Sequence, residues 1–288
     1  MQCKYSRRIL FILLLKWGTE MENIRPAAVA GLFYPASSDE LVQVVNNELS
    51  LVTLQSEHHP LAIIVPHAGY IYSGAIAASA FKYLQKFCSS IKRIVLIGPS
   101  HRVAFRGLAL SNADFFQTPL GSVRLDKHGQ EKLLTIPGVQ LLDQAHANEH
   151  SLEVQLPFLQ QVLDDFTLLP IVAGDASAEL VAQTLDTVWD GPETLIVVSS
   201  DLSHYHDYDT AQQLDETTSK AIVDLDYTAI ASVNACGYVG LNGLLLFAKN
   251  RHLKASIIDV RNSGDTAGDK SSVVGYGSYL FEEQTHAV

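Results

Sequence analysis

Polar and titratable residues follow apolar runs at three places in the chain. In TLIVVSSDLSHYHDYD (194–209), an apolar stretch leads directly into Asp201 and His204. The runs LAIIVPH and RIVLIGPSH end in His67 and His101. Imidazole is the commonest protein ligand for borderline metals, and a nearby carboxylate can fix its tautomer. A metal site is therefore one interpretation of these residues, provided that the fold brings the three segments together.

Each histidine on its own has a plainer interpretation, because an imidazole at a strand end is more often a hydrogen-bonded structural residue than a ligand. Recurrence at three strand ends favours the metal site. Cys236, in NACGYVGLNGLL, is by composition a small buried apolar residue. If it joins His67 and His101, two imidazoles and a thiolate suit iron, copper or zinc, whereas magnesium and calcium prefer oxygen ligands.

A further cluster lies in HANEHSLEVQLP (146–157), which contains Glu149 and His150. Acidic residues are favoured at a helix N-terminus, which explains Glu149 but not His150. We therefore predict that both residues lie in the wall of the pocket or behind the ligands. The segment lacks the HExxH spacing, which excludes a zinc protease of that class.

Missing motifs exclude other chemistries. Ser200, Asp201 and His204 have the residue types of a hydrolase triad, but they are crowded into five positions, and no G-x-S-x-G turn exists. Neither a P-loop nor a G-x-G-x-x-G motif is present, so we expect no nucleotide cofactor. The loop DVRNSGDTAGDKSSVVGYGSY, which contains Arg261 and Asp265, has two open interpretations: ordinary turn chemistry or the rim of a pocket.

The elements that must position these residues alternate between apolar strands and amphipathic helices. A late strand is predicted in SSVVGYGSYLF, and the other predicted strands are 61–67, 93–101, 168–174, 194–201 and 255–260. Because these other runs are almost continuously apolar, both faces of their sheet should be covered. The alternation predicts an α/β sandwich around a mixed, largely parallel sheet.

Helices are predicted in SSDELVQVVNNEL, SLEVQLPFLQQVL and SAELVAQTLDTVW. A serine caps the first of them, and Pro157 is expected to kink or bound the second. Gly98 is expected to permit a tight turn after its strand. Ligands of open α/β sheets gather beyond the carboxyl ends of the strands, where His67, His101 and Asp201 are all predicted.

Composition limits the function further. The chain has 288 residues, 47% of them hydrophobic, and a net charge of 20 − 31 = −11. A phosphate backbone would be repelled, and no basic stripe is present, so nucleic acid is excluded as a partner. Three widely spaced cysteines suit free thiols in a reducing compartment, which predicts a cytoplasmic protein.

The N-terminus has a composition of its own. KYSRRILFILLLK has a basic flank and an apolar run that is too short to span a bilayer. It is similar to the core of a signal peptide, but no small-residue cleavage site follows. We interpret residues 1–20 as a false start or extension, with Met21 opening a single domain over 21–288. The alternative is an export signal or a weak membrane anchor.

Seven motifs in order resemble those of the Memo family: RPAAVAGLFYP, PHAGYIYSG, IGPSH, NEHSLEVQLPFLQ, SSDLSHY, ACGYVG and SGDT. Prokaryotic members of that family are called AmmeMemoRadiSam system protein B. The resemblance covers about residues 24 to 282, which agrees with a start at Met21. It implies the fold of the class III extradiol dioxygenases, an α/β sandwich with a non-haem iron site at one sheet edge.

The resemblance also implies roles for individual residues. The metal would be held by His67, His101 and Cys236, with His204 and Asp201 as catalytic groups in the same pocket. The dioxygenases have a carboxylate where this chain has Cys236, and a thiolate changes both redox tuning and metal preference. The residues expected in the pocket wall or behind the ligands are Tyr70, Glu149, His150 and Asp265.

Three functions follow as hypotheses. The first is a metal-dependent redox or oxygenase-like enzyme that uses iron or copper, with His204 as acid or base. The second is a non-catalytic binding protein that keeps the pocket for a small molecule, a peptide or a protein partner. The family name implies a radical-SAM protein and an AMMECR-type protein as such partners. The third is a hydrolase in which zinc activates water.

Overall fold

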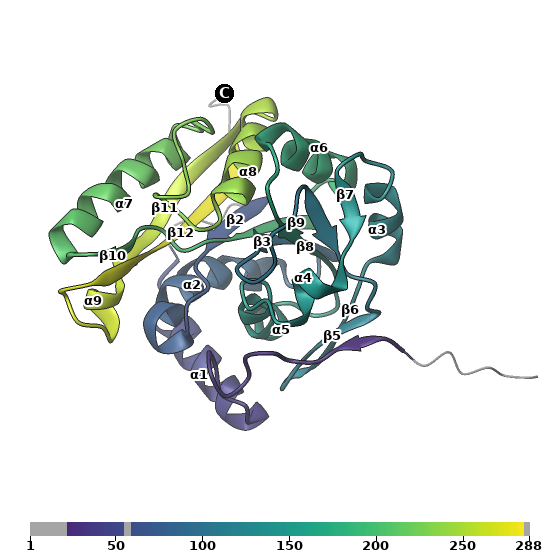
Figure 1. Cartoon of the computed structure of the whole chain (residues 1–288). Helices are drawn as coiled ribbons and strands as arrows, with labels where there is room; N and C mark the ends of the chain where they lie inside the picture. The colour runs from purple at the N-terminus through teal and green to yellow at the C-terminus, as the bar shows by residue number, and fades with distance from the viewer. Residues whose placement is uncertain (1–21, 55–58, 285–288) are drawn as a thin grey trace, which may run out of the picture.

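The structure is a computed structural model that describes residues 22–54 and 59–284 (Figure 1). Its strands are β1 (Ile24–Arg25), β2 (Ala62–Val65), β3 (Arg93–Pro99), β4 (Leu108–Leu110), β5 (Phe115–Thr118), β6 (Gly121–Arg124), β7 (Val139–Leu141), β8 (Thr167–Ala173), β9 (Thr194–Ser199), β10 (His204–His206), β11 (Leu253–Asn262) and β12 (Val273–Glu283). Its α-helices are α1 (Ser38–Ser50), α2 (Tyr70–Leu84), α3 (Lys127–Leu133), α4 (Asp143–Ala147), α5 (Leu156–Val162), α6 (Ala178–Val188), α7 (Tyr208–Val223), α8 (Tyr238–Asn250) and α9 (Ser263–Thr266). Short 3₁₀ turns are η1 (Gln85–Phe87) and η2 (Glu153–Gln155).

A large mixed sheet runs through the middle of the molecule, in the order β10-β12-β2-β9-β3-β8-β4-β7. The central strands β2, β9, β3 and β8 are parallel to one another. Outside them β12 and β4 run antiparallel to their inner neighbours, and β11 pairs antiparallel with β12. The α/β sandwich around a mixed sheet is therefore confirmed, with its parallel part at the centre. A separate small sheet joins β1, β5 and β6.

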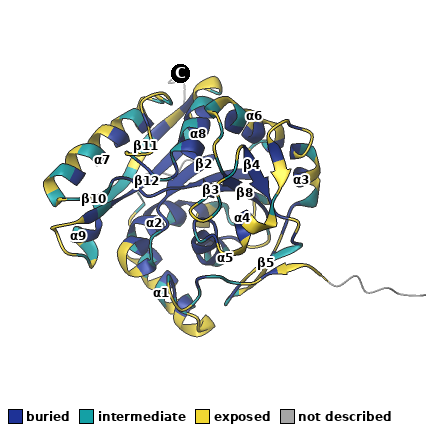
Figure 2. Cartoon of the chain, in the orientation of Figure 1, coloured by how far each residue is buried: buried dark blue, intermediate teal, exposed yellow. Residues whose placement is uncertain are grey.

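Alternate side chains of the central strands enter two different cores. Ile63 and Val197 face the core beneath α1, α2 and α5, whereas Ile64 and Val198 face the core beneath α6, α7 and α8. All of these side chains are fully buried, as Figure 2 shows for the strands they belong to. Continuously apolar strands are thus explained by helices on both faces of the sheet.

Serine residues cap the N-termini of two of the predicted helices. Ser37 and Ser177 accept hydrogen bonds from the first turns of α1 and α6. The segment expected to be helical from residue 151 begins as η2, and Pro157 lies in the first turn of α5, so this proline marks a boundary. Gly98, however, lies inside β3, and the predicted turn there is wrong. A side chain at Gly98 would collide with Ser151, so the glycine permits close packing.

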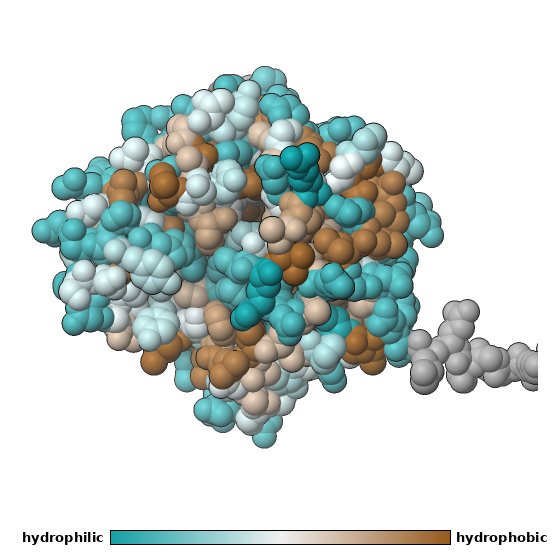
Figure 3. All heavy atoms as spheres, in the orientation of Figure 1, coloured by the Kyte–Doolittle hydropathy of each residue, from teal (hydrophilic) through white to brown (hydrophobic). Residues whose placement is uncertain are grey.

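The predicted N-terminal extension and Met21 lie outside the described residues, so the interpretation of this segment stays a prediction. Within the described ranges, no helix is long and apolar enough to cross a bilayer. On the face shown in Figure 3, hydrophobic residues form separate groups among hydrophilic ones. Cys88 and Cys236 are both free thiols.

Candidate metal site

The carboxyl ends of three parallel strands form the floor of the site. His67 follows β2, His101 follows β3 and Asp201 follows β9, each two residues after its strand. Because these strands are neighbours and parallel, their ends meet at one edge of the sheet. The loop before α8 brings Cys236 to the same edge, where its Sγ lies 3.3 Å from Nε2 of His67.

Neighbouring residues fix the tautomer of His67. The hydroxyl of Ser199 donates to the carbonyl of Ser151 at 2.5 Å and accepts from the amide of Gln155 at 2.8 Å. Its contact with Nδ1 of His67 at 3.0 Å must therefore be donated by the imidazole. His67 then carries its proton on Nδ1 and presents the lone pair of Nε2. Burial, followed by the repulsion that protonated imidazoles would exert on one another, lowers the pKa of His67 to about 3, which keeps the ring neutral.

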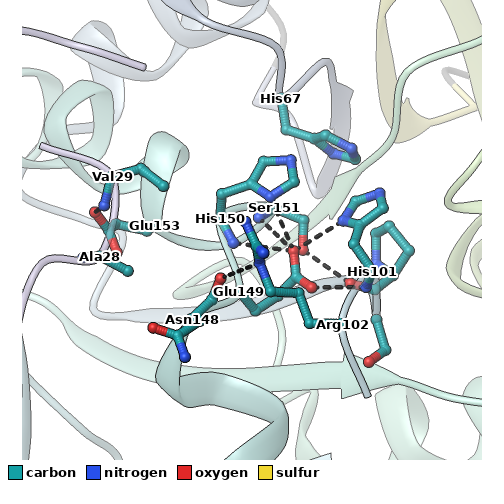
Figure 4. A network of polar contacts seen from close by, with 12 residues as sticks. Ala28, Val29, His67, His101, Arg102, Asn148, Glu149, His150, Ser151 and Glu153 are labelled. Carbon is teal, nitrogen blue, oxygen red and sulfur yellow. Dashed lines mark hydrogen bonds and ion pairs between the residues drawn. The ribbon is translucent and has the colours of Figure 1, made fainter. Parts of the chain in front are cut away.

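His101 is oriented in the same way by a carboxylate. Its Nδ1 lies 2.9 Å from Oε1 of Glu149, and its backbone N–H donates to Oε2 at 2.7 Å. Figure 4 shows the two side chains facing each other. Since a carboxylate accepts hydrogen bonds, Nδ1 of His101 carries a proton and Nε2 is left as the donor atom for a metal.

Cys236 is positioned by close packing against β9 and the segment after it. The backbone N–H of Gly237 donates to the hydroxyl of Ser200 at 3.0 Å. A Cβ atom at Gly237 would lie 2.6 Å from Cβ of Ser200, so only glycine permits this approach. Burial, and secondly the charge of Asp201, raises the pKa of Cys236 to about 12, so without a metal the sulfur keeps its proton.

The His67, His101 and Cys236 side chains together form a group that fits a soft or borderline metal. One potential ligand atom from each lies within 4.8 Å of the others. Two imidazoles and one sulfur are a donor set for iron, copper or zinc. Their second nitrogen atoms are already occupied by Ser199 and Glu149, which is the usual support for ligating histidines.

Glu149 and His150 lie beside this group. His101, Glu149 and His150 form a second cluster of potential ligand atoms. The Glu149 carboxylate is already occupied, because Oε1 also accepts the backbone N–H groups of His150 and Ser151 at 2.9 Å. Burial by itself raises the pKa of Glu149, but hydrogen bonding and attraction from His101 outweigh it and lower that pKa to about 2. Glu149 therefore orients His101 instead of binding a second ion.

His150 forms part of the pocket wall. Its ring stacks on His101 with centroids 4.6 Å apart and meets the edge of His67 at 5.5 Å. Burial, and secondly the repulsion that His67 and His150 would feel if both were protonated, lowers the pKa of His150 to about 4. His67 and His150 are therefore both neutral at neutral pH.

A buried ion pair stabilises the segment that carries Glu149 and His150. Arg25 donates to Glu153 at 2.5 Å, and also to the carbonyls of His146 and Glu149 at 2.8 and 2.7 Å. The Glu153 carboxylate, which is fully buried, also accepts backbone N–H groups from Ala28 and Val29. The N-terminal segment of the described chain is thereby tied to the loop that carries Glu149 and His150.

Asp201 and His204 also line the pocket, but no hydrogen bond joins them in the described part of the chain. Asp201 accepts the backbone N–H of His67 at 2.7 Å, so it orients the segment that carries that histidine. His204 begins β10 and is followed by Tyr205, whose φ of 61° is left-handed and whose side chain is 78% exposed. A bulky residue in that conformation is strained, and such strain is common at functional sites.

The metal pocket is a cavity of about 800 Å³. Of the residues predicted for the site, it is lined by His67, His101, His150, Asp201, His204 and Cys236. It is also lined by side chains that were not predicted: Phe33, Tyr72, Tyr205, His206 and Tyr276. Phe33, Tyr72 and Tyr205 lie inside the motifs RPAAVAGLFYP, PHAGYIYSG and SSDLSHY, so proximity to predicted residues was the available signal.

Two predicted residues lie elsewhere. Tyr70 is buried in the core, where its hydroxyl donates to the carbonyl of Val154 at 2.7 Å and its ring packs on Phe158. Asp265 belongs to the capping box of α9 and accepts a hydrogen bond from Tyr208 at 2.6 Å. The structure places neither side chain among those that line the metal pocket. Tyr72, two residues after Tyr70, lines the metal pocket instead.

Comparisons of the sequence with a family model and with curated relatives agree on one family. The family model described as Memo-like protein matches residues 25–280. A MEMO1 family protein of Metallosphaera sedula is 34% identical over 283 residues, which cover 90% of this chain and 99% of that protein. A MEMO1 family protein of Thermotoga petrophila is 37% identical over 278 residues, covering 89% and 99%. A solved structure of an uncharacterized Escherichia coli K12 protein matches with a TM-score of 0.49 and 15% identity, over 76% of this chain and 98% of that one, too distant for a functional argument.

Proposed function

The chain belongs to the Memo-like protein family, and on that premise we propose that it is a metal-dependent redox or oxygenase-like enzyme. It binds iron or copper through Nε2 of His67, Nε2 of His101 and Sγ of Cys236. When bound, such a metal supplies one-electron redox chemistry that the side chains themselves lack. The sequence motifs imply a fold like that of the class III extradiol dioxygenases, and we include this fold relationship in the proposal.

One observation carries the proposal: both histidines are held with their Nδ1 protons donated to protein groups. Ser199 accepts from His67 and Glu149 accepts from His101. One potential ligand atom from each imidazole lies within 4.8 Å of the other and of the Cys236 sulfur, which matches a preorganised ligand set. Buried polar atoms normally have hydrogen-bond partners, and this group is easier to explain as a metal site than as a structural network.

The other pocket residues have roles that do not require ligation. His204 lines the pocket without a hydrogen-bond partner in the described part of the chain, so it is available to accept or donate a proton on a bound substrate. Asp201 fixes the backbone at His67. Phe33 and Tyr72 supply aromatic walls against which an apolar part of the substrate would pack.

Metal content of variants tests the proposal. The protein is purified without oxygen, and iron, copper and zinc are measured per chain in the wild type and in the His67→Ala/His101→Ala double variant. We expect close to one metal per wild-type chain and almost none in the double variant. His128→Ala, at an exposed position on α3, is the matched control and should keep the metal. Equal metal content in wild type and double variant contradicts the proposal.

Spectroscopy distinguishes the metals. Iron or copper bound to Cys236 should give a sulfur-to-metal charge-transfer absorption that is lost in Cys236→Ser. Protein that carries zinc alone, after growth in medium containing all three metals, favours the zinc hydrolase hypothesis instead.

Exposed apolar side chains at the pocket mouth favour a second function, that of a binding protein without turnover. Tyr205 and Val233 line the pocket, and they are 78% and 72% exposed. Such side chains on a rim are typical of a site for a peptide or a protein partner. A radical-SAM protein or an AMMECR-type protein that co-purifies with the wild type, and is lost from Tyr205→Ser, would support it. Turnover that disappears in His204→Ala would contradict it.

A further inference from the structure

Tyr276 is a buried tyrosine in the wall of the metal pocket. It lies in β12 between two glycines, Gly275 and Gly277, and opposite Arg261 of β11. The space beside Gly275 is filled by the carboxylate of Asp215, and the space beside Gly277 by the ring of Tyr279. Close packing around both glycines therefore fixes this part of the strand.

The position of the Tyr276 hydroxyl is unusual for a buried residue. Only 2% of Tyr276 is exposed, and the residue lines the metal pocket. Its hydroxyl has no hydrogen-bond partner among residues 22–54 and 59–284, yet its oxygen is not among the fully enclosed unpartnered atoms of those residues. The polar end of the side chain is therefore open toward the cavity.

Other buried tyrosines of this protein have partners for their hydroxyls. Tyr34 donates to Glu153 at 2.6 Å, and Tyr70 donates to a backbone carbonyl at 2.7 Å. Tyr279, on the same strand as Tyr276, shares a hydrogen bond of 2.7 Å with Ser219. A buried phenol normally finds such a partner, because an unpaired donor costs free energy. Tyr276 differs from these residues in leaving its donor available to something in the pocket.

Asp201 does not accept a hydrogen bond from the Tyr276 hydroxyl, although it lies near enough for its charge to affect the pKa of Tyr276. After burial itself, Asp201 is the next cause that raises the pKa of Tyr276, so the hydroxyl keeps its proton. Oδ1 of Asp201 accepts the backbone N–H of His67, and no hydrogen bond joins Asp201 to Tyr276 in the described part of the chain. The pocket thus presents a protonated phenol close to a carboxylate, with the His67, His101 and Cys236 group in the same cavity.

We propose that Tyr276 is a ligand-contacting residue, whose hydroxyl donates a hydrogen bond to an acceptor atom of the molecule bound in the metal pocket. The inference rests on the proposed metal site and adds a substrate requirement to it: the ligand carries an oxygen or nitrogen acceptor in addition to its apolar body. The apolar body is bounded by the rings of Phe33 and Tyr72.

Azide is the probe for this donor, because it binds exposed iron or copper and accepts hydrogen bonds. Azide is titrated into metal-loaded wild type and Tyr276→Phe, and its dissociation constant is read from the azide-to-metal absorption. We expect about tenfold weaker azide binding in the variant, with unchanged metal content, since one hydrogen bond to a charged acceptor is lost. The longer anion thiocyanate is titrated in parallel and should show the same order of effect.

The thermal stability of Tyr276→Phe shows whether the hydroxyl contacts the ligand or stabilises the fold. The melting temperature of metal-free Tyr276→Phe should equal or exceed that of the metal-free wild type, because no hydrogen bond within the protein is removed. Tyr279→Phe is the matched control on the same strand. It should lower the melting temperature and leave azide binding unchanged.

The outcomes are distinct. Unchanged affinity for both anions in Tyr276→Phe overturns the inference while leaving the metal site intact. A melting temperature lowered as much as in Tyr279→Phe also overturns it, because the hydroxyl is then structural. A wild-type protein that binds no metal overturns the proposed function and this inference together. Weakened anion binding at full stability supports the assignment.

Discussion

Nδ1 of His101 lies 2.9 Å from Oε1 of Glu149, and the same carboxylate accepts the backbone N–H groups of His101, His150 and Ser151. Four donors on one carboxylate explain why Glu149 is held as an anion, with its pKa lowered to about 2 despite burial. The consequence for His101 is a fixed ring orientation and a fixed tautomer. Glu149 is thus part of the site through its effect on His101.

Glu149→Gln tests that relationship. The amide keeps the size of the side chain but removes the negative charge and weakens the preference for a proton on Nδ1 of His101. We expect the affinity for iron or copper to fall about 10- to 100-fold, as for other residues that support a ligating histidine. Competition with a coloured chelator measures the affinity. Glu179→Gln, on the exposed side of α6, should bind metal like the wild type, and equal affinity in Glu149→Gln would contradict the role.

Arg25→Met tests the ion pair behind the site. Arg25 is 6% exposed and Glu153 is fully buried, so removing the guanidinium leaves an uncompensated carboxylate in the core. We expect the free energy of unfolding to fall by about 3–5 kcal/mol. Urea denaturation measures it. Lys220→Met, which breaks an exposed pair with Asp224, should cause no measurable loss, and similar losses in both variants would contradict the prediction.

His146 should make the fold sensitive to acid. Its Nε2 donates to the carbonyl of Ala109 at 3.0 Å, its Nδ1 is buried without a partner, and burial together with nearby Arg25 lowers its pKa to about 4. Between pH 6.5 and about 4 the unfolded chain binds a proton there that the folded chain does not. Stability from this residue is therefore complete above pH 6.5 and is lost as the pH falls through that window, by up to about 3 kcal/mol.

His146→Gln removes this titration, while the amide can still donate to Ala109. Unfolding free energies are compared at several pH values between 7 and 4 for both proteins. The wild type should lose more stability on acidification than the variant, and His67 and His150, which also have lowered pKa values, contribute equally to both curves. Parallel curves would show that His146 does not titrate as described.

Much of this fold could be predicted from the sequence, because the main signals are local. Apolar runs near 62–65, 93–99 and 194–199 became neighbouring parallel strands, each buried on both faces. The carboxyl ends of parallel strands share one edge, so His67 and His101 could be placed together from the sequence alone. The motif resemblance was needed for Cys236, whose surroundings resemble those of an ordinary buried cysteine.

Side-chain direction was less predictable. Tyr70 and Tyr72 are two residues apart at the start of α2, and a helix turns them toward different surroundings, so the motif did not show that Tyr72 faces the pocket. Tyr276 gave no signal, because a tyrosine in an alternating strand pattern is ordinarily core. Asp265 has the chemistry of a site residue, but its carboxylate is used in the capping box of α9.

Gly237→Ala tests how Cys236 is held in place. The first turn of α8 approaches β9 so closely that a Cβ atom at Gly237 would lie 2.6 Å from Cβ of Ser200 and 2.8 Å from the carbonyl oxygen of Ser199. Because strand atoms in the core cannot move aside cheaply, the start of α8 must shift and take Cys236 with it. We expect a loss of about 1–3 kcal/mol in unfolding free energy.

Gly237→Ala should weaken metal binding by more than its loss of stability alone would explain. Displacement of Sγ from its position 3.3 Å from Nε2 of His67 should weaken iron or copper binding and change the sulfur-to-metal absorption, measured at a temperature where the variant is folded. Gly74→Ala, inside α2, is the control. A Cβ atom there meets its nearest neighbour at 3.4 Å, so alanine should be tolerated and metal binding kept. If Gly237→Ala binds metal as tightly as Gly74→Ala, with the same absorption, close packing at Gly237 does not position the thiol.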